Sequence, residues 1–242
     1  MRYLIIADIH ANLAAFETVL AAAGNYDEIW CLGDLVGYGP DPEACVELLR
    51  QKPHVAVAGN HDWATIGRLD MADFNPAARA AIEWTAEHIG GDTRAYLQSL
   101  PVRERRGDFT LVHGSPRAPI WEYVDEPSVA LENMEHFDTP HCLVGHSHIP
   151  MLYVMGERRG VREVFLQGDM IGVRFADARS IFNPGSVGQP RDGDPRAAYA
   201  VLDSDTGLAE LHRVEYPVQV TQRRMLKVGL PTRSAYRLTL GR

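Results

Sequence analysis

The chain has 242 residues, of which 45% are hydrophobic and 23% are charged, a composition typical of globular proteins with a buried core. Its formal net charge of −8 argues against a general nucleic-acid surface, because nonspecific binding to nucleic acid needs clustered Lys and Arg. No apolar run approaches the roughly 20 residues that a membrane helix needs, so we expect no membrane-spanning segment.

The start of the chain and its cysteines indicate the cytoplasm. Met1 is followed within a few residues by an apolar run, which leaves no room for a signal peptide. Cys31, Cys45 and Cys142 are odd in number and have apolar neighbours. We therefore expect reduced thiols in the core and neither a disulfide framework nor a thiolate metal site.

The first part of the chain alternates between predicted strands and helices. Apolar runs at residues 3–7, 29–32 and 55–58 predict buried strands. Helical spacing of Leu13, Phe16 and Leu20 predicts a helix over residues 12–23. After the second strand, Asp41 is the expected cap of another helix, whose buried face carries Cys45, Leu48 and Leu49.

A helical excursion is expected around residues 64–100. Asn75 and Pro76 predict the start of one helix, because Asn caps helices and Pro is tolerated in the first turn. Asp92 is expected to cap a short helix that reaches Leu100. This excursion separates the two halves of the chain.

The second half contains shorter β-like segments. They cover residues 102–106, 109–113, 142–144, 151–155, 161–166, 181–182, 197–202 and 208–214. Helices in the first half and hairpins in the second predict an α/β fold, a four-layer α/β/β/α sandwich with two packed mixed β-sheets in a single domain over residues 1–242. The tail from Pro217 is expected to be solvated or dimer-facing, which leaves a homo-oligomer open.

Polar side chains follow the predicted strands at the points where the strands end. These residues are Asp8, His10, Asp34, Asn60, His61, His113, His146 and His148. Sites in layered α/β proteins lie beyond the carboxyl ends of the strands, so we expect these side chains to form one cluster.

The cluster offers oxygen and imidazole ligands without thiolates, which suits two divalent ions such as Mn, Fe, Co, Ni or Zn. The seven candidate ligands are Asp8, His10, Asp34, Asn60, His113, His146 and His148. Seven residues fill two sites of four ligands only if one carboxylate bridges. Asp34 is the natural bridge, because Asp can present one oxygen to each ion.

Other interpretations apply to single residues in this pattern. One His at a strand end is more often a hydrogen-bonded core residue than a ligand, but five His residues share the pattern here. Asp62 has two open interpretations, as part of the site or as an anchor of its turn.

In their order along the chain, these motifs resemble those of the calcineurin-like metallophosphoesterases. That family carries Asp-x-His, Gly-Asp, Gly-Asn-His-Asp/Glu, His and Gly-His-x-His. The five blocks stand here as Asp8-Ile9-His10, Gly33-Asp34, Gly59-Asn60-His61-Asp62, His113 and Gly145-His146-Ser147-His148. The size and the segment Asn183-Pro184-Gly185-Ser186 are most similar to the small bacterial and archaeal phosphodiesterase branch.

The resemblance implies two metal sites that share one residue. One ion is held by Asp8, His10, Asp34 and His148, and the other by Asp34, Asn60, His113 and His146. His61 is then free for catalysis, as a proton donor to the leaving oxygen or as a stabiliser of charge on phosphorus. The implied reaction is hydrolysis of a small phosphodiester or phosphomonoester, with nucleotide-derived compounds among the candidates, by a metal-bridging hydroxide.

One departure from the family concerns the residues after Gly33-Asp34. Many relatives, the protein phosphatases above all, carry Asp and Arg there, whereas this chain has Leu35, Val36, Gly37 and Tyr38. The family uses that Asp to orient the catalytic His, so the orienting group of His61 stays open. The departure also weighs against the main enzymatic alternative, a protein serine/threonine phosphatase. The complete set of ligand types argues against a second alternative, a non-catalytic scaffold of the same fold.

Three side chains are candidates for contact with the substrate. Asn12, Arg117 and Arg191 each lie a few residues beyond a candidate ligand or the Asn-Pro-Gly turn, and each can donate to phosphate oxygens. The competing interpretation of each Arg is a solvated surface charge.

Overall fold

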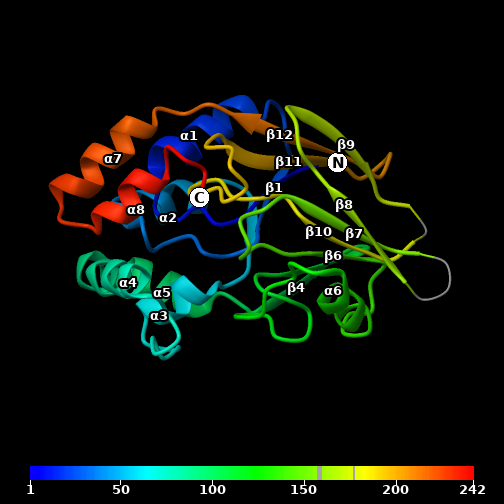
Figure 1. Ribbon diagram of the computed structural model, residues 1–242, viewed down its shortest axis with the longest axis horizontal. Coiled ribbons are helices and arrows are strands. Elements are labelled where there is room, and N and C mark those ends of the chain that lie inside the picture. The colour runs from blue at the N-terminus through cyan, green and yellow to red at the C-terminus, as the bar shows by residue number, and fades with distance from the viewer. Residues whose placement is uncertain (157–159, 177) are drawn as a thin grey trace.

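The computed structural model describes residues 1–156, 160–176 and 178–242. Two six-stranded sheets lie face to face, with helices outside them (Figure 1). The strands are β1 Arg2–Ile6, β2 Glu28–Cys31, β3 His54–Ala56, β4 Arg103–Arg106, β5 Phe109–Val112, β6 His141–Leu143, β7 Met151–Met155, β8 Val161–Phe165, β9 Met170–Arg174, β10 Ser180–Asn183, β11 Ala197–Asp203 and β12 Leu208–Val214. The helices are α1 Leu13–Ala22, α2 Pro42–Arg50, α3 Asn60–Thr65, α4 Pro76–His88, α5 Gly91–Ser99, α6 Pro127–Asn133, α7 Val218–Lys227 and α8 Thr232–Arg237.

Each sheet contains three neighbouring parallel strands. The first sheet has the order β3-β2-β1-β11-β12-β9, in which β1, β2 and β3 are parallel. The second has the order β4-β5-β6-β10-β7-β8, in which β5, β6 and β10 are parallel. The remaining pairings are antiparallel, so both sheets are mixed. Parallel strands bring their carboxyl ends to one edge, which is where polar tips can meet.

Three apolar clusters define the layers. The cluster between the first sheet and its outer helices includes Phe16 of α1 and Leu49 of α2. The two sheets bury Ile5, Leu143 and Phe182 between them. A third cluster packs α6 on the outer face of the second sheet. The predicted α/β/β/α sandwich with two mixed sheets is thus confirmed.

Local signals placed most helix starts correctly. The Asn75 side chain accepts a hydrogen bond from the backbone N–H of Ala78 at 3.0 Å, as expected of a cap on α4. Asp41 precedes α2, but its carboxylate pairs with Arg224 instead of capping. The prediction for Asp92 was wrong, because α5 begins at Gly91 and Asp92 lies inside its first turn.

The segment after Pro217 is the main correction to the predicted fold. It forms α7 and α8, and Met225, Leu230 and Leu238 bury apolar surface against the region of α3 and α4. Figure 1 shows α7 and α8, in orange and red, on the same side of the molecule as α3, α4 and α5. The tail is therefore part of the packed structure. Its apolar residues recur at helical spacing, but the many charged residues between them obscured this pattern in the sequence.

The three cysteines are buried free thiols, as predicted. Within the described ranges, no helix combines the length and the apolar character needed to cross a bilayer.

Candidate metal centre

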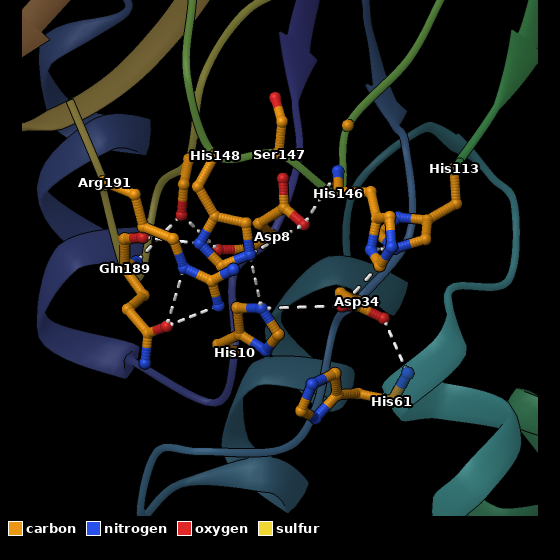
Figure 2. A network of polar contacts seen from close by, with 12 residues as sticks. Asp8, His10, Asp34, His61, His113, His146, Ser147, His148, Gln189 and Arg191 are labelled. Carbon is orange, nitrogen blue, oxygen red and sulfur yellow. Dashed lines mark hydrogen bonds and ion pairs between the residues drawn. The ribbon is translucent and has the colours of Figure 1, made fainter. Parts of the chain in front are cut away.

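The polar tips of the parallel strands converge between the two sheets (Figure 2). From the first sheet come Asp8 and His10 after β1, Asp34 after β2, and Asn60 and His61 after β3. From the second sheet come His113 after β5, and His146 and His148 after β6. Each of these residues is less than 5% exposed, so the chain buries a dense group of ionisable side chains at one place.

The first group that could hold a metal ion consists of Asp8, His10, Asp34 and His148. Nε2 of His10 lies 3.1 Å from Nε2 of His148 and 3.5 Å from Oδ2 of Asp34. Nε2 of His148 lies 3.4 Å from Oδ1 of Asp8. These donor atoms lie within 4.8 Å of one another, close enough to face one ion.

The second group consists of Asp34, His113 and His146. Nε2 of His113 lies 3.4 Å from Oδ2 of Asp34 and 3.2 Å from Nδ1 of His146. Oδ1 of Asn60 lies 2.9 Å from the same nitrogen of His113. Asp34 therefore belongs to both groups. The sequence predicted one Asp34 oxygen for each group, but in the structure Oδ2 faces both. The other oxygen, Oδ1, accepts the backbone N–H of His61 instead.

Backbone carbonyls orient all four imidazoles. The contacts join His10 Nδ1 to Val36 (3.2 Å), His113 Nδ1 to Leu32 (2.9 Å), His146 Nε2 to Trp121 (3.0 Å) and His148 Nδ1 to Gln189. A carbonyl can only accept, so each of these ring nitrogens is the donor. The opposite nitrogen of each ring then faces the cluster, which is the usual arrangement of His ligands.

The charges of the cluster fit a cation. Burial lowers the pKa of His10 and of His148, so both rings are neutral. Their Nε2 atoms then present lone pairs to each other at 3.1 Å, which is unfavourable without a positive charge between them. Oδ2 of Asp8 is buried and has no hydrogen-bond partner among the described residues, and burial raises the pKa of Asp8 to about 7. The residues present thus fit divalent metal ions.

The ionised carboxylate of Asp34 is also stabilised by a nearby positive charge. Burial by itself raises the pKa of Asp34, but the charge and the hydrogen bond of His113 outweigh burial and hold it well below its usual range. Burial lowers the pKa of His113, whereas Asp34 raises it to about 9. A proton on His113 thus balances Asp34 in the metal-free chain, and a metal ion would replace it.

The backbone of the cluster is unusual. Among the residues that the structure describes, seven that are not glycine have positive φ. Five of them are candidate ligands, namely Asp8, His10, Asp34, His146 and His148, with φ between 49° and 66°. Such angles are uncommon outside Gly, Asn and Asp and concentrate at functional sites. The tight turns at the strand ends therefore aim these side chains inward.

His61 lies beside the first group, and aromatic rings hold it in place. Its ring centroid is 4.8 Å from that of His10 and 4.4 Å from that of Tyr38. Nδ1 of His61 is buried and accepts or donates no hydrogen bond within the part of the chain that the structure describes, and burial lowers the pKa of His61 to about 4. A Cβ atom on Gly37 would lie 2.5 Å from that nitrogen. Packing on Tyr38 and Gly37 positions the ring, where the sequence left the orienting group open.

Asp62 anchors the turn, which settles its two interpretations. Its carboxylate accepts the backbone N–H of Gly59 at 2.9 Å and that of Val36 at 3.1 Å. It is fully buried, and it ties the loop after β3 to the loop after β2. The side chain therefore binds the backbone of two loops, the one that carries Asp34 and the one that precedes Asn60.

A cleft of about 500 Å³ opens over the cluster. Its lining combines members of the cluster with aromatic side chains and two arginines, namely Asp34, Tyr38, Asn60, His61, Asp73, Phe74, Asn75, Ala78, Trp121, Tyr123, His146, His148, Arg191 and Arg237. Nη2 of Arg191 donates to Oε1 of Gln189 at 2.8 Å, which holds the guanidinium beside His10 and His148 (Figure 2). Of the three predicted substrate contacts, Arg191 is the one that lines this cleft.

The other two predicted contacts do not line this cleft. Asn12 is buried and caps α1, and its side chain also bonds to Gly188, Tyr216 and Thr221, so no donor is left for a substrate. Arg117 lies outside the cleft lining and pairs with Glu122 and Glu132. Both residues are near the candidate ligands in sequence, but tertiary contacts direct them elsewhere.

Tyr123 and Arg237 are among the cleft residues that the sequence did not point to. Tyr123 stacks on the ring of His146 with centroids 3.9 Å apart. Arg237 comes from α8, 89 residues beyond His148, the last candidate ligand, and no local motif marks it. Tyr123 is an aromatic residue shortly after His113, so the sequence offers a weak signal for it. Arg237 can be assigned to the cleft only from the fold.

Comparison with known proteins agrees with this geometry. A family model described as calcineurin-like phosphoesterase superfamily domain matches residues 1–207. The crystal structure of a metallophosphoesterase from Sphaerobacter thermophilus is 48% identical, with a TM-score of 0.91 over 100% of this chain and 99% of that one.

Two curated relatives extend the match. Uncharacterized protein MJ0912 of Methanocaldococcus jannaschii is 36% identical over 98% of this chain and 97% of its own length. Phosphodiesterase YfcE of Escherichia coli is 28% identical over 85% of this chain and 89% of its own length. With the family model spanning most of the sequence, the chain belongs to the calcineurin-like phosphoesterase superfamily and is a phosphoric ester hydrolase.

Proposed function

We propose that this protein hydrolyses small phosphodiesters with the help of two divalent metal ions. The observation that carries the proposal is the carboxylate of Asp34, whose Oδ2 faces two buried groups of ligand-type side chains at once. We assign Asp8, His10, Asp34 and His148 to one ion, and Asp34, Asn60, His113 and His146 to the other. Phosphodiesters are favoured over monoesters because YfcE is similar along most of its length.

When bound, two such ions would activate a water molecule as the nucleophile and neutralise charge on the phosphoryl oxygens. Their combined charge of about +4 exceeds the −2 of Asp8 and Asp34, so an anionic substrate is attracted despite the acidic chain. The mixed imidazole and carboxylate donors admit Mn, Fe, Co, Ni or Zn.

The chain's own residues position the ester and protonate its leaving group. Arg191 lines the cleft, and its guanidinium can donate to phosphate oxygens. His61, left over once the ligands are assigned, donates a proton to the leaving oxygen as the P–O bond breaks. A neutral imidazole can already donate a hydrogen bond, and the negative charge of a bound phosphate raises the low pKa of His61.

The size of the cleft favours a small substrate. A volume of about 500 Å³ falls within the roughly 300–1,000 Å³ of small-molecule sites. The aromatic lining, which includes Tyr38, Trp121 and Tyr123, can contact an organic group such as a nucleobase. Nucleotide-derived diesters are therefore the first candidates. We place the protein in the cytoplasm, where such compounds and reduced thiols occur together.

The experiment is to measure metal content by mass spectrometry and to assay the same preparation on a panel of substrates. The panel contains aryl and alkyl phosphodiesters, phosphomonoesters and phosphoserine peptides. We expect two ions per chain and the highest kcat/KM on a small diester. A preference for phosphopeptides would favour the protein phosphatase, and neither metal nor hydrolysis would favour a scaffold.

A further inference from the structure

The cleft continues into a second and larger cavity beside α8. This cavity has a volume of about 910 Å³ and is lined by the first turn of α4 and by residues of the C-terminal segment. Tyr38, Asn75 and Arg237 line both spaces. Because three side chains border both, the second cavity adjoins the cleft. The two together are called the groove, and its part beside α8 contains no candidate metal ligand among the described residues.

The charged side chains of this second cavity are all positive. They are Arg233, Arg237 and Arg242, and no carboxylate side chain lines it in the described part of the chain. The cleft itself contains the exposed Asp73 as well as Asp34 of the metal centre. The part of the groove near α8 is therefore lined by more positive and fewer negative side chains than the part near the ligand cluster.

Arg237 and Arg191 line the same cleft. Within residues 1–156, 160–176 and 178–242, neither guanidinium forms an ion pair with an Asp or Glu side chain, whereas Arg117, Arg196 and Arg213 all do. Burial and then the charge of Arg191 lower the pKa of Arg237. Two guanidiniums in one cleft repel each other, and an anion between them removes the repulsion.

The orientation of Arg237 suits an anion in the groove. Its Nε donates to a main-chain oxygen of Arg242, the last residue of the sequence, which fixes the plane of the guanidinium. Both terminal nitrogens then have no hydrogen-bond partner among the described residues. The first turn of α4, which carries Asn75, Pro76 and Ala77, lies on the same cavity and adds the positive end of its helix dipole.

We propose that Arg237, supported by Arg233, forms a distal subsite that binds a second phosphate group of the substrate. Preferred substrates are then diesters that carry another phosphate on the part that extends along the groove. The inference rests on the proposed function for the position of the first phosphate. It assigns to the C-terminal segment a role in substrate selection that the family motifs do not contain.

The first test is equilibrium binding by calorimetry on the full chain saturated with Mn²⁺. The probes are butyl phosphate and butane-1,4-diol bisphosphate, which have the same carbon chain and differ by one phosphate. We expect the bisphosphate to bind at least about ten-fold more tightly, the size of one charge-assisted hydrogen bond. The variant Arg237→Gln should lose most of that ten-fold preference.

The control variant is Arg223→Gln, which removes the same charge from exposed α7 but lines neither cavity. It should keep the preference for the bisphosphate. Equal binding of the two probes to the parent chain would overturn the subsite. So would an equal loss of preference in both variants, because that result would show a general effect of net charge.

Kinetics separate this inference from the proposed function. The substrates are butyl p-nitrophenyl phosphate and its 4-phosphobutyl analogue, which release the same phenol. We expect the ratio of their kcat/KM values to favour the analogue about ten-fold and to fall toward one in Arg237→Gln. Equal hydrolysis of both substrates by the parent chain would overturn the subsite and leave the proposed function intact. Hydrolysis of neither would overturn the proposed function, and calorimetry would still decide the subsite.

Discussion

The backbone N–H of His61 donates a hydrogen bond of 2.9 Å to Oδ1 of Asp34. Oδ2 of the same carboxylate lies 3.5 Å from Nε2 of His10 and 3.4 Å from Nε2 of His113. One oxygen of Asp34 thus fixes the turn that carries the candidate proton donor, while the other faces both metal groups. Changes at Asp34 are therefore expected to differ in kind from changes at any other ligand.

The substitution Asp34→Ala is expected to remove or scramble both ions, because it deletes the one carboxylate that the two groups share. Asp8→Ala is expected to affect mainly one ion, since Asp8 belongs to the first group alone. Metal stoichiometry of the purified variants, measured by mass spectrometry, checks both statements. Two ions retained in Asp34→Ala would rule out Asp34 as the essential bridge.

Gly37 is expected to be required for the position of His61. In Gly37→Ala the new Cβ would lie 2.5 Å from Nδ1 of His61, and φ is +86°. Displacement of the ring by about 1 Å can lower kcat/KM by about 10²-fold. The control is Gly67→Ala, where φ is +77° and no atom of the described residues lies within 4 Å of the new Cβ.

Both alanine variants should lose about 1 kcal/mol of unfolding free energy from backbone strain, but only Gly37→Ala should lose activity. Denaturant unfolding and kinetics on the same preparations provide the comparison. Full activity in Gly37→Ala would mean that the His61 ring tolerates displacement and is not held by packing.

His61→Gln is expected to keep its metal content and fold but to lose proton donation. Loss of a general acid lowers the rate by about 10² to 10⁴ and hurts alkyl esters more than aryl esters, because an aryloxide departs with little proton help. The measurement is the ratio of kcat/KM losses for an alkyl and an aryl ester of the same phosphate. Equal losses would make His61 a stabiliser of charge, and depleted metal would make it a ligand.

Asp62→Ala is expected to destabilise the fold more than an ordinary surface change. It leaves the buried N–H groups of Gly59 and Val36 without an acceptor, each at a cost of about 1–3 kcal/mol. Asp205→Ala, which removes an exposed ion pair with the N-terminus, should cost much less, because solvent screens that pair. Urea unfolding of both variants tests the difference, and equal stabilities would contradict the anchoring role of Asp62.

Activity lost on chelation is expected to return with Mn²⁺. Four imidazoles in the two groups favour a borderline ion over one that binds almost only oxygen. Activity titrated with each metal after removal of the chelator checks this point. If Mg²⁺ alone restored hydrolysis, the assignment of the imidazoles as ligands would be wrong.

The sequence predicted the parts of the site that follow from local pattern and topology. Asp8, Asp34 and His113 each stand within two residues of the end of a short apolar run, and parallel strands bring such tips to one edge whatever the details of packing. Strand β9 was missed for the opposite reason. Most of its residues are at least partly exposed, including Met170, so it lacks the buried run that marks the other strands.

Side chains whose role depends on distant partners could not be predicted. Asn12 forms a hydrogen bond with Thr221, 209 residues away, and the residues near Asn12 in sequence do not predict that contact. Arg237 reaches the cleft because Leu230 and Leu238 bury the C-terminal segment against α4. The charged residues around those leucines instead suggested a solvated tail. Packing between remote segments decided both cases.

The left-handed backbone of the cluster has a consequence for how this protein can change. Each of Asp8, His10, Asp34, His146 and His148 holds a positive φ that costs on the order of 1 kcal/mol more than it would for glycine. Glycine at one of these places would relieve strain and delete a donor atom in the same step. A glycine substitution at these strand ends is therefore expected to raise stability and to lower activity. A thermostable version of the enzyme has to be sought in its helices and outer strands.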